Sequence, residues 1–239
     1  MRFITFIFFL ILTVHERIIA MSDEVQSYNS ISKVLHWGVA FLILGLLFVG
    51  FYMKGLVPPF KFEVYGVHKA LGMVVLATAV LRIIWKHASK SPKALDTHAK
   101  WEKFLSKTIH IVLYILMVAM PLSGWMMSSA GGYPVSFFGL FEFPAIVGEN
   151  KQIGGIAHQA HTVIAYALII CVGLHIVGAL KHHVIDKDLT MTRMGAHPVL
   201  ALLGLLLLAA ALYFPAKKFV QDMTKTKEVV AVEGEQKTE

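Results

Sequence analysis

The chain is poor in cysteine and in charged residues, and each shortage excludes a class of protein. Cys171 is the single cysteine among 239 residues, so no disulfide can form within the chain, and the C-x-x-C-H motif of covalent c-type haem attachment is absent. Only 15% of the residues are charged, whereas 56% are hydrophobic, and the mean hydropathy is +0.66. These values exceed those of an ordinary soluble domain. The composition therefore predicts an integral membrane protein.

Carboxylates are scarce in the apolar parts of the chain, where Glu63 lies only at an edge. Five apolar runs approach the roughly 20 residues that cross a hydrocarbon core of about 30 Å. These runs are Val34–Met53, Val64–Trp85, Ile109–Met127, Ile156–Leu180 and Pro198–Phe214. We therefore predict an all-α four-helix transmembrane bundle with a fifth, shorter C-terminal transmembrane helix.

The formal net charge of +7 does not indicate a nucleic-acid partner, because the basic residues lie mainly between the apolar runs. The connection after the second run is the richest in lysine, and Arg82 lies just inside it. Its lysines are Lys86, Lys90, Lys93, Lys100, Lys103 and Lys107. Basic connections stay on the cytoplasmic side of a membrane. The amino terminus is thus expected in the cytoplasm, and the carboxyl tail outside if the fifth run spans.

The two ends of the chain differ from its apolar middle. Residues 1–29 form an N-terminal extension whose apolar stretch is too short to span, and Met21 suggests a misassigned translation start. An uncleaved amphipathic anchor is the alternative. Residues 30–194 are expected to form the four-helix domain and 195–215 the additional helix. Residues 216–239, which mix lysine with glutamate, are expected to form a disordered polar tail.

Two histidines in the fourth run, His161 and His175, are the most informative residues in the sequence. They are 14 residues apart in HTVIAYALIICVGLH, close to four helical turns, so both project from nearly the same face about 21 Å apart. Histidine is costly in hydrocarbon and is normally kept there for a function. A flat metal cofactor near each membrane surface would explain both, because neutral imidazole is a common metal ligand.

Two further histidines lie at matching depths in other runs. His36 in KVLHW lies near the cytoplasmic end of the first run, and His68 in YGVHKALG lies at a similar depth from the outer end of the second. The fourth run passes from outside to inside, which places His161 near the outer surface and His175 near the inner one. Depth therefore pairs His68 with His161 and His36 with His175, giving two sites with two imidazoles each.

Other histidines compete with this set. His158 lies three residues before His161, but its spacing of 17 to His175 turns it about 100° away from the shared face. His110, near the inner end of the third run, is a second choice that would replace His36 or line the same pocket. A histidine near a helix end can also simply sit at the lipid interface or bond a backbone carbonyl. This class is expected to contain His15, His87, His98 and His197.

The residue types available as ligands limit which metal could bind. Structural zinc favours mixed cysteine and histidine sets in compact spacing, whereas four histidines with one cysteine, Cys171, and no carboxylate in the spans fit iron in a porphyrin. Without C-x-x-C-H the remaining form is non-covalent haem b. Gly72, four residues after His68, and Gly178, three after His175, would let a porphyrin approach the backbone. Small residues serve ordinary membrane helix packing equally well.

Four segments occur together and in order: SKVLHW, VHKALG followed by Leu81-Arg82, IHIVLYILMVAMPLSGW, and AHQAHTVIAYALIICVGLHIVGALKHH. Over about residues 30–194 the chain therefore resembles the bacterial cytochrome b561 family. The resemblance implies a four-helix bundle in the bacterial inner membrane that carries two b haems. The family's iron ligands fall on His36, His68, His161 and His175. The N-terminal extension and the apolar run and tail after residue 193 depart from the short family members.

The resemblance also implies electron transfer between a small donor and the membrane quinone, and one type of relative is a superoxide:ubiquinone oxidoreductase. If superoxide is the donor, basic residues at the outer mouth would steer it. The candidates are Lys54, Lys61, Lys69 and Lys151, which are otherwise ordinary interfacial lysines. Arg82 is placed to meet a haem propionate or merely marks the membrane boundary. His182 is a weaker candidate for a hydrogen bond to the quinone, and the aromatic connection Ser128–Gln152 is a candidate lid or anchor at the outer surface.

Two other classes of function remain open at this stage. A non-enzymatic haem-carrying anchor would relay electrons from a partner dehydrogenase or cytochrome to quinone. A metal or proton transporter would use the same histidines, but it requires acidic residues along its path, and the runs contain almost none.

Overall fold

The computed structural model describes residues 27–93, 95, 98–213 and 217. Four long helices make up most of it, namely α2 (Ser30–Tyr52), α3 (Phe60–Ala88), α4 (Lys100–Ala130) and α5 (Lys151–Val184). The predictions for residues 1–26 and 218–239 lie outside the described residues.

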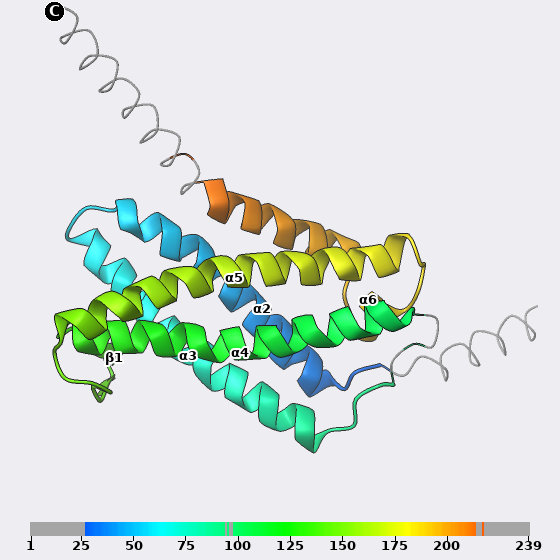
Figure 1. Ribbon diagram of the computed structural model, residues 1–239, viewed down its shortest axis with the longest axis horizontal. Coiled ribbons are helices and arrows are strands. Elements are labelled where there is room, and N and C mark those ends of the chain that lie inside the picture. The colour runs from blue at the N-terminus through cyan, green and yellow to red at the C-terminus, as the bar shows by residue number, and fades with distance from the viewer. Residues whose placement is uncertain (1–26, 94, 96–97, 214–216, 218–239) are drawn as a thin grey trace, which may run out of the picture.

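Short elements connect the long helices. The 3-10 turn η1 (Met53–Gly55) follows α2, and the one-turn helix α6 (Thr190–Arg193) follows α5. Between α4 and α5 lies an antiparallel hairpin of β1 (Val135–Phe137) and β2 (Phe141–Phe143), in which Ser136 pairs with Glu142. The hairpin and α6 lie at opposite ends of the bundle (Figure 1). We refer to these as the hairpin end and the α6 end.

All four long helices are long and apolar enough to cross a membrane. Their outer surfaces carry exposed large apolar side chains such as Phe41, Ile84, Ile115 and Ile170. Contiguous apolar surface of this kind is rare on a soluble monomer, whereas in a bilayer it faces lipid. The predicted four-helix membrane bundle is confirmed.

Each of these helices begins before the apolar run that predicted it, and in α2, α4 and α5 a side chain caps the polar first turn. The Asn150 side chain accepts hydrogen bonds from the backbone N–H groups of Gln152 and Ile153, both at 3.0 Å, at the start of α5. The Glu102 carboxylate accepts one from the Ala99 N–H at 2.9 Å at the start of α4. Such caps satisfy orphan N–H groups at a helix start. Hydropathy detects only the lipid-embedded part of the helix.

The core lies along the middle of the bundle, where α5 packs against α4 over most of its length. Val39 of α2, Ala79 of α3, Met117 of α4 and Leu168 of α5 are buried there. The four apolar faces meet around these residues. The antiparallel order that results brings the start of α2, the end of α3, the start of α4 and the end of α5 to the α6 end.

The apolar run after α6 forms the helix Pro198–Tyr213. At 1.5 Å per residue it is about 24 Å long, short of a hydrocarbon core of about 30 Å. It packs on the bundle: Leu208 is buried, and a Cβ added at Gly204 would lie 3.1 Å from Cδ1 of Ile176 on α5. The predicted helix is therefore present, and its crossing of the membrane stays a prediction.

Candidate functional site

Five histidines of the long helices form two groups. His36 of α2, His110 of α4 and His175 of α5 gather at the α6 end and interact with one another. His68 of α3 and His161 of α5 lie toward the hairpin end and are near enough to interact electrostatically. The structure thus places His36, His110 and His175 in contact, and it leaves His68 and His161 within electrostatic range of each other.

At the α6 end, the rings of His36 and His175 have centroids 6.0 Å apart and planes inclined by 57°. A metal bonded in line to two imidazoles at about 2 Å each holds the ring centroids roughly 6 Å apart. The separation therefore suits two axial ligands of one iron. The ring of His110 lies edge-on to His175 with centroids 5.0 Å apart, so it lines the same pocket.

Arg82 reaches this cluster from α3. Its guanidinium Nη2 lies 2.6 Å from Nδ1 of His36, and its Cζ lies 5.5 Å from the centre of the Tyr114 ring. Arginine has only donors, so Nδ1 of His36 accepts, and the proton of the neutral ring is on Nε2. Iron ligation through Nε2 would move the ring proton to Nδ1, whereas ligation through Nδ1 would occupy that nitrogen. In either case Arg82 must leave Nδ1 of His36.

At the hairpin end, two contacts from α4 orient the ring of His161. Nδ1 of His161 lies 3.2 Å from the carbonyl oxygen of Met120 and 3.0 Å from Oγ of Ser123. The geometry assigns the proton to Nδ1, which donates to the carbonyl and leaves Nε2 free as a ligand. Metal-binding histidines commonly use the second ring nitrogen in this way.

His68 completes the pair at the hairpin end. Its Nδ1 is buried and has no hydrogen-bond partner among the described residues, a state that costs free energy unless something binds the ring. Glycines border both imidazoles: a Cβ at Gly50 would lie 3.3 Å from Cε1 of His68, and one at Gly124 would lie 3.1 Å from Cε1 of His161. An orphaned buried imidazole nitrogen beside glycine cradles fits the attachment of a haem.

Other residues named from the sequence fall outside these two groups. His158 is exposed, so it does not compete with His161. A Cβ at Gly72 or Gly178 would meet nothing within 4 Å, which leaves room beside both for a planar group.

The α6 end holds a third group of titratable side chains. Nδ1 of His182 lies 2.7 Å from Oδ2 of Asp186 and 3.4 Å from Oδ2 of Asp188. That nitrogen already has carboxylate partners, and a quinone contact by His182 stays a prediction. His98, expected at the lipid interface or on a backbone carbonyl, instead lies 2.6 Å from the Asp188 carboxylate through Nε2. His98 and Asp188 come from separate connections, so no sequence spacing revealed their meeting.

The hairpin is fastened to the bundle beside His68. Nζ of Lys69 donates to the Pro134 carbonyl at 2.5 Å and to Oγ of Ser128 at 3.3 Å, and Nε1 of Trp125 donates to the Pro144 carbonyl at 3.1 Å. The predicted steering residue Lys69 therefore holds the connection in place. A lid function of this aromatic connection stays a prediction.

Known proteins are similar to this chain over most of its length. A family model described as prokaryotic cytochrome b561 matches residues 27–197. The chain is similar to "Cytochrome b561 homolog 2" of Escherichia coli K12, at 29% identity over 177 residues that cover 73% of this chain and 94% of the relative. It is also similar to a Yersinia pestis protein named "Probable superoxide oxidase CybB", at 24% identity over 170 residues that cover 71% and 96%. The family match ends at the residue before the helix Pro198–Tyr213.

Proposed function

The chain belongs to the prokaryotic cytochrome b561 family of membrane electron-transfer proteins, and from this premise we propose that it holds two b-type haems and passes electrons from a small donor to the membrane quinone pool. One observation carries the proposal: two groups of imidazoles lie at different depths along α5, with His161 and His175 about 21 Å apart along the helix. Electrons that pass between the two groups would cross most of the hydrocarbon core, which is about 30 Å thick.

The four histidines have distinct tasks in this proposal. His68 and His161 hold one haem at the hairpin end, and His36 and His175 hold the other at the α6 end. If both histidines of a pair bound the iron, no position would remain for oxygen, which would favour electron transfer. Haem b supplies reversible one-electron transfer between ferric and ferrous iron. The hydrogen bond from His161 to the Met120 carbonyl keeps Nε2 unprotonated and fixes the orientation of the ring.

In this proposal Arg82 contacts His36 when no haem is bound and would contact a haem propionate when haem is bound. Iron binding by His36 would displace Arg82 from Nδ1 of His36, and the guanidinium would then be available to pair with a haem propionate. Arginine forms strong, directional hydrogen bonds to carboxylates. His110, whose Nδ1 donates to the Ser106 carbonyl at 2.6 Å, lines the same pocket and is the reserve ligand.

The side at which superoxide would donate its electron follows from the expected topology. We place the chain in the bacterial inner membrane with its amino terminus in the cytoplasm, so that the hairpin end faces outward. Lys54, Lys61 and Lys151 lie toward that end, where positive charge would attract superoxide. Two superoxide ions would lose one electron each to give two oxygen molecules, and one ubiquinone would take up both electrons with two protons. The relative named as a superoxide oxidase supports this choice of donor.

The first test is a count of haem in the detergent-purified chain, by pyridine haemochrome and reduced-minus-oxidised spectra. We expect two low-spin b haems per chain. The second test supplies superoxide and a soluble ubiquinone analogue and follows quinol formation, with superoxide dismutase as the control. Absence of haem would overturn the proposal. Two haems without any quinone reduction would instead support an anchor that serves a partner dehydrogenase or cytochrome.

A further inference from the structure

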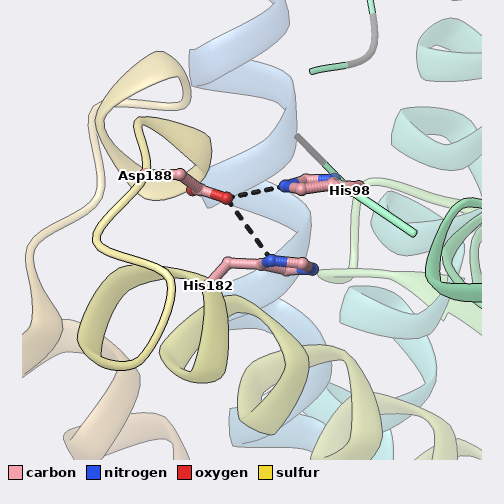
Figure 2. Close-up of side chains that lie close together, drawn as sticks. All are labelled: His98, His182 and Asp188. Atoms are coloured by element: carbon pink, nitrogen blue, oxygen red, sulfur yellow. Dashed lines mark hydrogen bonds and ion pairs between the residues drawn. The ribbon is translucent and has the colours of Figure 1, made fainter. Parts of the chain in front are cut away.

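A cluster of three metal-ligating side chains lies at the α6 end, outside the two haem sites. His98 belongs to the connection between α3 and α4, His182 to the last turn of α5, and Asp188 to the turn before α6 (Figure 2). One ligand atom from each residue lies within 4.8 Å of the other two. Three segments far apart in the sequence therefore meet at one point.

The two imidazoles are arranged to share the carboxylate. Their rings are stacked, with centroids 4.0 Å apart and planes inclined by 23°. Nε2 of His98 lies 2.6 Å and Nδ1 of His182 lies 3.4 Å from Oδ2 of Asp188, and Figure 2 shows both nitrogens pointing toward that oxygen. The side chains are 15%, 14% and 9% exposed, respectively. The cluster is thus sheltered but open to an ion from solution.

We propose that His98, His182 and Asp188 bind a divalent zinc ion. Two imidazole nitrogens and a carboxylate oxygen are ligands that zinc accepts in a tetrahedral site with one open position. Zinc bonds of about 2 Å place tetrahedral ligand atoms roughly 3.3 Å apart, and the two separations from Asp188 lie on either side of this value. Because the two rings are stacked, both must rotate about their side-chain bonds to direct a nitrogen at one ion.

Zinc binding requires each imidazole to present an unprotonated nitrogen. The ring proton would therefore move from the nitrogen that faces Asp188 to the other ring nitrogen. Oδ1 of Asp188 accepts a hydrogen bond from the Thr190 N–H at 2.7 Å, which leaves Oδ2 to bind the cation.

Asp186 supports the site from one side. Its Oδ2 lies 2.7 Å from Nδ1 of His182 and 2.7 Å from Nζ of Lys181. The Lys181 ammonium, which would repel a cation, is neutralised by this carboxylate and by Glu102 of α4. Water or Asp186 itself would fill the fourth position on zinc.

A bound ion would fasten the connection between α3 and α4 to the end of α5. Nη1 of Arg193 in α6 already donates to the Lys93 carbonyl of this connection at 2.8 Å. Zinc would add a second link, from the connection to α5, the helix that carries His175. This assignment uses none of the haem ligands, so zinc content can be measured whether or not haem is bound.

The test uses the full chain, purified with its haem and without a polyhistidine tag. The protein is treated with chelator, equilibrated with zinc against a competing chelator of known affinity, and analysed for zinc and iron by elemental mass spectrometry. We expect one zinc per chain in the wild type. His98→Gln and Asp188→Asn should each weaken zinc binding at least roughly tenfold, because loss even of a supporting residue commonly costs this much. His87→Gln, which alters an exposed histidine at the end of α3, is the matched control and should bind zinc as the wild type does.

The haem spectrum distinguishes loss of the site from loss of the fold, because correctly folded variants should retain the wild-type spectrum. X-ray absorption at the zinc edge should show two imidazole ligands, which keeps the test valid if a variant fails to fold. Equal zinc binding by the wild type and by both site variants would overturn the assignment. Fewer than two imidazoles at the zinc, or no zinc bound by the wild type at micromolar concentration, would also overturn it.

Discussion

Gly124→Ala tests whether the clearance beside His161 is required for binding of the haem at the hairpin end. The added Cβ would lie 3.1 Å from Cε1 and 3.3 Å from Nδ1 of His161, closer than ordinary van der Waals contact, so the ring must shift by a few tenths of an ångström. The ring cannot move freely, because its Nδ1 is held by the Met120 carbonyl and by Oγ of Ser123. The strain is therefore expected at the bond between Nε2 and iron.

Two opposing contributions determine the stability of this variant. Replacing glycine by alanine inside a helix favours folding by about 1 kcal/mol, whereas overpacking a tight contact costs about 1–3 kcal/mol. The net destabilisation should therefore lie between roughly zero and 2 kcal/mol. Because the fold survives a change of this size, the effect should appear locally, as lower occupancy or an altered reduction potential of one haem.

The assay for Gly124→Ala is a haem count per chain combined with a redox titration that resolves the two haems. Gly45→Ala on α2 is the control, because a Cβ there would meet nothing within 4 Å, and it should retain both haems at unchanged potentials. Gly50→Ala, with a Cβ 3.3 Å from Cε1 of His68, should produce a smaller effect on the same haem. If Gly124→Ala matched the wild type in haem content and in both reduction potentials, the conclusion that haem binding requires the space beside His161 would be refuted.

His68→Ala should remove the haem at the hairpin end alone and His175→Ala the haem at the α6 end alone, so that the pyridine haemochrome count falls from two to one in each; two haems in either variant would contradict the pairing. Lys69→Gln should release the hairpin, because it loses the bond to a backbone carbonyl, and hydrogen exchange at residues 135–143 should become faster; unchanged exchange would show that other contacts hold it. Arg82→Gln should lower the reduction potential of the haem at the α6 end, because loss of a nearby positive charge favours ferric iron. The effect should be on the order of 1 kcal/mol, or some tens of millivolts, and a redox titration would contradict this if the potential stayed the same or rose.

The architecture of the bundle and the spacing along α5 could be predicted because both depend on local pattern. Long apolar runs form helices wherever they meet a bilayer, since each backbone polar group must be satisfied within its own segment. The interval between His161 and His175 converts directly into distance and direction on one helix. Helix ends were less predictable. The polar first turns of α4 and α5 are held by caps at Glu102 and Asn150, which hydropathy does not detect.

The sequence by itself determined that this chain is a four-helix membrane protein, and it indicated which histidines lie at equal depth, because depth depends only on position within a run. Only the tertiary structure decided which side chains meet at that depth. It brought His110 against His175 and Arg82 onto His36, and it joined His98 to Asp188 from separate connections. Such contacts depend on the rotation and packing of whole helices and on the paths of the loops between them, and these are set by the summed packing of many side chains rather than by any local spacing.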